Sequence, residues 1–183
     1  LMEGISHEAL SLAGHLKLKN LVMLFDNNSI SIDGPTNLAV SDNFKKRFNS
    51  YGWDFIEIDG HNEGQIIKAF KKAQKTKRPT TISCKTTIGY GSPNKSGTAS
   101  THGNPLGKDE TILVRKKLKW DHKPFIVPEK ILKEWREIGN KAAKKEIKWE
   151  KAYNKKKSLI EETLSHDFKK IFEIEKQNII KNP

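Results

Sequence analysis

The sequence predicts an α/β fold: a doubly wound parallel sheet with helices on both faces, followed by a charged helical extension. Three short apolar runs are bounded by polar or glycine-containing turns, which is typical of buried strands. Segments with apolar residues at helical spacing separate these runs. Strands that alternate with helices of this kind indicate parallel βαβ units, whose helices cover both faces of the sheet.

The first predicted helix and strand open the chain. Apolar residues recur at helical spacing between residues 6 and 18, and a continuous apolar run follows at residues 21–25. This pattern predicts a helix and then a buried strand. The run ends in Asp26, Asn27 and Asn28, so polar side chains stand where the strand is expected to end.

Two further strands are predicted at residues 53–58 and 79–86. Between them, Asn62 and, three residues later, Gln65 resemble a capping box that opens a helix reaching Ala73. The carboxyl ends of parallel strands lie at one edge of their sheet, and ligands bind in the crevice beyond that edge. The loops that follow the three strands are therefore the first candidates for a site.

Two of these loops have an unusual composition. The first spans residues 26–36, and the second spans residues 88–107, with five glycines, two prolines and His102. A loop of about 20 residues without regular structure is rare in a compact domain unless it is functional or disordered. We interpret this one as functional. After Gly107 the sequence predicts a short helix, a proline-punctuated link and a charged helical tract over residues 131–180.

The net charge of +12 makes a basic nucleic-acid-binding module one alternative, because a basic field attracts phosphate backbones. The charge is spread, with +4 in residues 1–107 and +8 in residues 108–183, where acidic residues interleave with the basic ones. Of the 34 basic residues 30 are lysines, whereas base-reading surfaces favour arginine. We therefore expect a solvated lysine-rich surface and no nucleic acid.

The sequence also bears on location. No apolar run approaches the roughly 18 residues of a membrane helix, so we expect no membrane partner. Cys84 is the single cysteine, which excludes an internal disulfide, and its apolar-rich run TTISCKTTI suggests a strand residue. These features favour a cytoplasmic protein. Because the sequence starts at Leu1 without a readable signal, we expect a piece of a longer chain.

Residue type alone gives several candidates for chemistry. The amide oxygen of Asn28, beside backbone carbonyls, is a hard donor that suits Mg²⁺ with phosphate oxygens as its other ligands. Asn and Asp are also common in turns for local reasons, which is the alternative for Asp26 and Asn28. His102 would contact a phosphate or a substrate oxygen, or is a plain loop residue. Glu3 and Glu8 flank a helix start, where acids also complement the helix dipole.

The chain resembles the transketolase family in two segments, LMEGISHEALSLAGHLKLKNLVMLFDNNSISIDG and TTIGYGSPNKSGTASTHGNPLG. The amino-terminal segment resembles the thiamine-diphosphate motif joined in midstream, and the later segment is similar to the downstream loop that meets the diphosphate. The similarity runs from Leu1 to about Pro128 and fades through the charged tail. It implies that residues 1–128 are part of the diphosphate-binding domain and that residues 129–183 are a helical extension and linker toward the next domain.

The resemblance implies a cofactor and its contacts. Asn28 would give its side-chain oxygen to Mg²⁺ (or Ca²⁺), and Ile30 its main-chain carbonyl, while an aspartate ligand would lie just upstream of Leu1. Ile32 and Ile88 would sandwich the thiazolium ring of thiamine diphosphate. His102 would touch both the diphosphate and the sugar.

The resemblance also implies supporting residues. Asp26 would hold the metal ligands in place without binding the metal itself. Glu3 and Glu8 would belong to a carboxylate cluster between the two subunits of a homodimer. Ala99 stands where many relatives carry another histidine, so that contact does not transfer to this chain.

The implied activity is transfer of a two-carbon ketol unit between sugar phosphates, from a ketose phosphate to an aldose phosphate, as in the pentose phosphate pathway. In this family an activating glutamate belongs to the next domain of the partner subunit, and nothing after Pro128 resembles that domain. We therefore expect the chain to be inactive by itself. Dihydroxyacetone synthase or another thiamine-diphosphate enzyme is an alternative, and so is a fragment that only binds a partner subunit.

Overall fold

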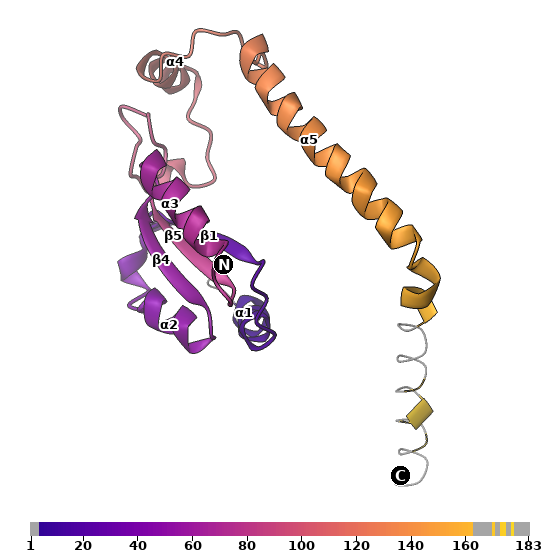
Figure 1. The fold of residues 1–183 in the computed structure, drawn as a ribbon. Helices are drawn as coiled ribbons and strands as arrows, with labels where there is room; N and C mark the ends of the chain where they lie inside the picture. Colours follow the sequence, from indigo (N-terminus) through magenta and orange to yellow (C-terminus); the bar gives the residue numbers. More distant parts are fainter. Residues whose placement is uncertain (1–3, 163–169, 171–172, 175–176, 178–183) are drawn as a thin grey trace. The chain divides into compact units, whose positions relative to one another are not determined.

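A computed structural model describes residues 4–162, 170, 173–174 and 177. The chain divides into two units, residues 1–121 and residues 122–183. The first unit holds the sheet and its helices, and the second holds the long helix α5 (Figure 1). The described elements of the first unit are, in chain order, α1 (Ile5–His15), β1 (Val22–Asn27), β2 (Ile30–Ser31), β3 (Gly34–Pro35), the 3₁₀ turn η1 (Thr36–Leu38), α2 (Phe44–Ser50), β4 (Asp54–Asp59), α3 (Glu63–Ala73), β5 (Thr80–Lys85), the 3₁₀ turn η2 (Ala99–Thr101) and α4 (Lys108–Lys117).

The main sheet has three parallel strands in the order β1–β5–β4. The central strand β5 has no exposed residue before its last position, because helices cover it on both sides. The pairing sets Val22 and Asp54 opposite Thr80 at the start of the ladder. The predicted α/β class and parallel sheet are thereby confirmed, with strand bounds that differ from the predicted ones by one or two residues.

One face of the sheet is covered by α1 and α2. Its core consists of Leu10, Ala13, Phe48 and Trp53. The indole N–H of Trp53, a residue only 2% exposed, donates to the Leu10 carbonyl at 2.8 Å, which ties α1 to the start of β4. At Gly14 an added Cβ would lie 1.7 Å from a backbone carbonyl oxygen beyond α2, so this close approach requires glycine.

The other face is covered by α3. Ala69 and Ala73 of this helix pack on Ile58 and Ile82 of the strands, and Figure 1 shows α3 in front of the sheet. The predicted capping box is half formed. The Asn62 side chain accepts from the Gln65 N–H at 3.0 Å, but the Gln65 side chain accepts from the backbone N–H of Asp59 at 2.9 Å and so closes onto the strand end.

Helix α2 did not appear among the sequence predictions. It has seven residues, too few for its apolar spacing to stand out, and its start is set by Asn43, whose side chain accepts from the Lys46 N–H at 2.9 Å. Phe48, fully buried on this helix, then completes the core beneath α1. A short helix of this kind depends on the core that it covers rather than on intrinsic propensity.

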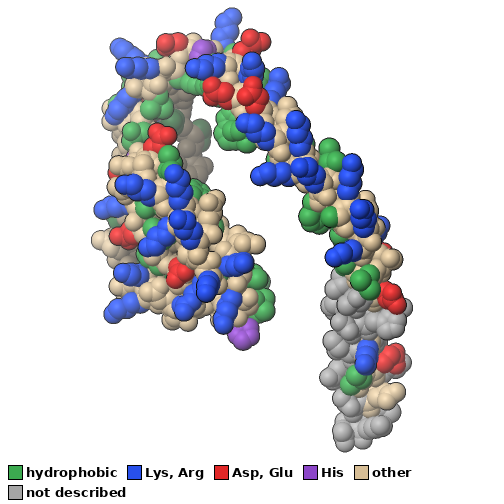
Figure 2. Space-filling view, viewed as in Figure 1, with side chains coloured by type: hydrophobic (Ala, Val, Ile, Leu, Met, Phe, Trp, Pro, Cys, Tyr) green, Lys and Arg blue, Asp and Glu red, His purple; other side chains and the backbone are tan. Residues whose placement is uncertain are grey.

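In the second unit, α5 runs from Glu129 to Asn154. The predicted tract of residues 131–180 is therefore helical over most of its described part, although its end lies partly outside the described residues. Figure 2 shows Lys and Arg side chains dispersed over the visible surface rather than gathered in one patch, with apolar side chains interleaved along α5. Exposed apolar residues on this helix include Trp135, Ile138 and Trp149.

Candidate functional site

The register of the main sheet aligns the ends of its three strands. Asn27 of β1 and Asp59 of β4 both pair with Lys85 of β5, so the chain leaves all three strands at the same level. The loops that begin with Asn28, with Thr86 and with Gly60 therefore start side by side. This edge is where a parallel sheet presents a ligand site.

The turn after β1 is organised by Asn28. Its side-chain oxygen accepts from the N–H of Ile30 at 3.0 Å, and its side-chain amide donates to Asp26 at 3.4 Å. Ser29 between them has a positive φ of 63°, which the turn requires. Asn28 is thus held from two sides, and its amide oxygen keeps a second lone pair for another partner.

The main chain of Ile30 faces outward from the small hairpin of β2 and β3. Ile30 lies opposite Pro35, which has no N–H. The neighbouring residues Ser29 and Thr36 are joined by a hydrogen bond of 3.0 Å from the Thr36 N–H to the Ser29 carbonyl. Ile30 and Pro35 are therefore a non-hydrogen-bonded pair, in which N–H and C=O point away from the partner strand. The N–H meets Asn28 on that outer side. In an antiparallel strand the C=O of a residue lies on the same side as its N–H, so this geometry directs the Ile30 carbonyl outward as well.

Asp26 joins the ends of β1 and β5. Its side chain accepts a hydrogen bond from the hydroxyl of Thr86, 60 residues later in the chain. Asp26 is exposed and also accepts from Asn28. The carboxylate therefore positions the Asn28 turn against the first residue of the loop after β5.

His61 joins the ends of β4 and β5, although local sequence pattern marks it only as part of a turn. Its Nε2 accepts from the backbone N–H of Thr87 at 3.0 Å, and its ring stacks on Tyr90 with ring centres 4.1 Å apart. It fixes the main chain next to Ile88.

The long loop folds back so that its two halves meet. The Ile88 carbonyl accepts from the Gly97 N–H at 2.8 Å. Gly89 has a φ of 64°, and a Cβ there would lie 2.9 Å from the Thr101 side chain. Ile88 is half-buried and directly precedes Gly89, and Thr101 directly precedes His102. The close approach of Gly89 to Thr101 therefore brings Ile88 near His102. The structure brings these two predicted residues to one part of the loop.

His102 has an unusual environment. Its Nδ1 is buried, and no hydrogen-bond partner for it exists among the described residues. Its backbone is fixed by a bond from its own N–H to Ala99 O at 2.9 Å. A buried ring nitrogen without a partner costs free energy unless a ligand or water supplies one.

Other predicted residues lie as follows. Ile32 stands at the tip of the β2–β3 hairpin and is 69% exposed, so its apolar side chain has no core role. Glu8 is an exposed residue in the first turn of α1. Glu3 lies outside the described residues. Cys84 is half-buried in β5, and burial, with a smaller effect from the Asp26 charge, raises the pKa of its thiol, as expected of an inert strand residue.

Sequence reasoning missed Glu110 entirely. This residue of α4 is buried. Its carboxylate accepts hydrogen bonds from the Ser92 hydroxyl, from the Asn94 backbone N–H and from the Asn94 side-chain amide. These bonds, together with the nearby charge of Lys95, lower the pKa of Glu110 to about 2, and the bond from the Ser92 hydroxyl has the largest effect. An acid in a first helical turn normally signals only the helix dipole, so no local pattern marked it.

Comparison with known proteins identifies the family. Residues 1–175 match the family model described as "Transketolase, thiamine diphosphate binding domain". The chain belongs to the transketolase family. It is 47% identical over 150 residues to the transketolase of Rhodobacter capsulatus, covering 82% of this chain and 22% of that protein. It is 52% identical over 148 residues to transketolase 1 of Pasteurella multocida, covering 79% of this chain and 22% of that protein.

Solved transketolases share the fold. The crystal structure of the Campylobacter jejuni enzyme matches with a TM-score of 0.82 at 37% identity, covering 92% of this chain and 27% of that one. A Pichia stipitis transketolase in complex with sedoheptulose-7-phosphate matches with a TM-score of 0.76 at 38% identity, covering 82% of this chain and 23% of that one. The chain thus spans about a quarter of the length of the transketolases that it matches.

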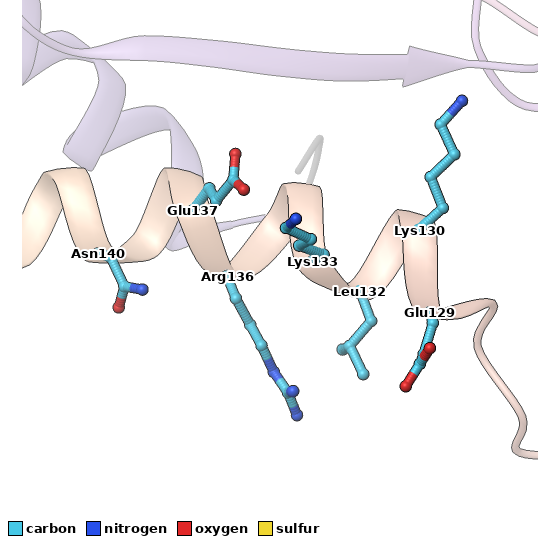
Figure 3. A pocket seen from close by; sticks show the side chains of 7 residues that line it. All are labelled: Glu129, Lys130, Leu132, Lys133, Arg136, Glu137 and Asn140. Carbon is cyan, nitrogen blue, oxygen red and sulfur yellow. The ribbon is translucent and has the colours of Figure 1, made fainter.

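Two hollows mark the described surface of this transketolase-family chain. One, of about 290 Å³, lies at the ends of β4 and β5 between Asp59 and Lys85. The other, of about 630 Å³, runs along α5 past Leu132 and Arg136 (Figure 3). All residues around it come from that one helix, so it lacks the opposing wall that encloses a small ligand. Neither hollow is lined by Asn28, Ile30 or His102, so the candidate site is placed at the strand ends by the strand register and the contacts described above.

The described residues contain no cluster of three or more His, Cys, Asp or Glu side chains able to hold a metal ion. Within that same part of the chain, no helix has the length and apolar character to cross a membrane.

Proposed function

We propose that this chain holds the metal and diphosphate end of thiamine diphosphate in a transketolase that moves a two-carbon ketol unit from a ketose phosphate to an aldose phosphate. The name of the matching family supports the cofactor. The relatives named as transketolases support the reaction, and the Pichia stipitis complex with sedoheptulose-7-phosphate supports a sugar phosphate substrate. The enzyme would serve the pentose phosphate pathway in the cytoplasm.

The observation that carries the proposal is the turn after β1. The second lone pair of the Asn28 amide oxygen and the outward carbonyl of Ile30 are uncharged oxygens on one side of the chain. Mg²⁺ or Ca²⁺ accepts such donors together with phosphate oxygens. The residues present therefore fit a divalent cation that is shared with a diphosphate. Asp26, held by Thr86 and Asn28, would orient this pair from behind.

Other residues would bind the remaining parts of the cofactor. The exposed side chain of Ile32 and the half-buried side chain of Ile88 would enclose its thiazolium ring. The buried Nδ1 of His102 would gain a partner when a diphosphate or sugar oxygen arrives. Thiamine diphosphate itself supplies the carbon nucleophile of the reaction, and the protein supplies binding, orientation and a fixed electrostatic setting.

The first helix would meet a second subunit. Ile5, Leu12 and Leu16 of α1 or its end are exposed by 86%, 57% and 57%, and their spacing places them along one side of the helix. Glu8 lies on the same helix, and Glu3 precedes it. We propose that this side forms part of a homodimer interface, where Glu3 and Glu8 would join the carboxylate cluster. Residues 129–183 would lead toward the next domain.

A paramagnetic probe tests the site even if affinity is low. Mn²⁺, which accepts the same oxygen donors as Mg²⁺, is added with thiamine diphosphate to the ¹⁵N-labelled 183-residue chain. The amide signals of Asn28, Ile30 and His102 should broaden first. Asn28→Leu removes the amide oxygen and should abolish this selective broadening.

The matched control is Asn49→Leu, because Asn49 is exposed in α2 and lies before β4, at the other end of the sheet. This variant should broaden like the wild type. Mn²⁺ without cofactor separates a diphosphate-dependent site from plain metal binding. Broadening centred elsewhere, or equal in the wild type and Asn28→Leu, would overturn the assignment.

A further inference from the structure

The glycine-rich loop of residues 88–107 is fastened to α4 by one buried carboxylate. Glu110 lies in the first turn of α4 and is 7% exposed. One of its oxygens accepts from the Ser92 hydroxyl and from the Asn94 backbone N–H at 2.9 Å, and the other accepts from the Asn94 side chain at 2.8 Å. A buried carboxylate with several donors makes strong, charge-assisted hydrogen bonds.

The fastening continues toward His102 through further hydrogen bonds. Ser92 Oγ accepts from the Lys95 N–H at 3.1 Å, and the Lys95 carbonyl accepts from the Thr98 hydroxyl at 2.7 Å. The Thr98 carbonyl in turn accepts from the Thr101 hydroxyl at 2.8 Å. The loop segment between Ser92 and His102 is therefore a connected series of side-chain to backbone bonds that begins at Glu110.

A second tie closes the same loop. The ammonium group of Lys95 donates to the Leu106 carbonyl at 2.8 Å, which joins the middle of the loop to the residue before Gly107. The low pKa of Glu110, lowered to about 2 by these donors, agrees with a carboxylate that stays charged in the folded chain. Since Lys95 is positioned by Ser92, this tie also depends on the carboxylate.

We propose that Glu110 is a positioning residue of the transketolase site: its carboxylate holds residues 92–95 and thereby sets the place of His102. Glu110 touches neither Ile88 nor His102 in any bond described above, so it acts through the loop. The role in a transketolase site rests on the proposed function, but the hydrogen bonds of Glu110 to residues 92–95 are present in the chain without ligand.

Amide hydrogen exchange of the ligand-free 183-residue chain tests this. In Glu110→Leu, a near-isosteric change without acceptors, exchange at Lys95 and His102 should rise roughly 10- to 100-fold, as expected for lost bonds to a charged group. Glu110→Gln keeps one acceptor oxygen and should show a smaller rise. The Ile82 amide in the central strand should stay protected in both variants, which a general loss of stability would not allow.

The matched control is Asp109→Leu, because Asp109 is the exposed neighbouring carboxylate in the same helical turn. It removes the same charge from the helix start and should leave exchange in the loop unchanged. Equal exchange in Glu110→Leu and the wild type would overturn the proposal, and so would a rise of similar size at Ile82. Neither result depends on whether thiamine diphosphate binds, so this failure is distinct from a failure of the Mn²⁺ experiment.

Discussion

The buried, unpartnered nitrogen of His102 leads to a prediction whose sign separates a ligand-binding histidine from a structural one. His102→Leu replaces the ring by an apolar side chain of related size. A structural histidine would lose bonds in this change and destabilise the chain. His102 Nδ1 has no partner among the described residues, so the substitution removes a desolvated polar atom instead. Residues kept in an unfavourable setting of this kind are typical of functional sites.

The size of the effect follows from the environment. A buried polar group without a partner costs about 1–3 kcal/mol, and His102 as a whole is half-buried, so a leucine in its place stays partly in contact with water and gains less than that full amount. We expect the free energy of unfolding to rise by about 0–1 kcal/mol in His102→Leu. His61→Leu is the matched control. It removes the acceptor of the Thr87 N–H and the stacking on Tyr90, and it should lower the free energy of unfolding by about 1 kcal/mol.

Urea unfolding of the 183-residue chain measures both changes. Tryptophan fluorescence reports the transition, because Trp53 is buried in the core of the first unit, whereas Trp135 and Trp149 of α5 are already exposed in the folded chain. The two leucine variants should move its midpoint in opposite directions or leave only the His61 variant displaced. If His102→Leu lowered the free energy of unfolding by more than about 1 kcal/mol, the ring would have a structural partner, and its assignment to the cofactor site would lose its support.

Two further predictions concern Glu110 and the isolated chain. The pKa of Glu110 falls from an ordinary 4.5 to about 2 on folding, so its contribution to stability is complete above pH 4.5 and is lost as the pH falls toward 2. Near pH 5 the urea midpoint of the wild type should exceed that of Glu110→Gln, and near pH 2 the two midpoints should converge. A difference between the midpoints that stays constant with pH would contradict the assigned pKa. We also expect the 183 residues to show no ketol transfer in a coupled assay with xylulose 5-phosphate, ribose 5-phosphate and saturating Mg²⁺ and thiamine diphosphate, and turnover above the blank without protein would contradict this.

Local patterns predicted most of the regular structure. The apolar runs indicated the three strands within one or two residues, and Asn62 marked the start of α3, because strand burial and helix capping are set by neighbours in sequence. The helix α2 was missed because seven residues carry too little periodicity. The proposed roles of Asn28 and His102 remain predictions that await the experiments above.

The sequence by itself determined the α/β class, the polar residues at the strand ends and the membership of the transketolase family. It could not determine how the loops are fastened to one another. Thr86 meets Asp26 from 60 residues away, Thr87 meets His61 from 26, and Ser92 meets Glu110 from 18. The pairing of β5 with β1 and β4 brings the first two pairs together, and the packing of α4 against the loop brings the third together. Such proximity leaves no trace in local spacing or composition.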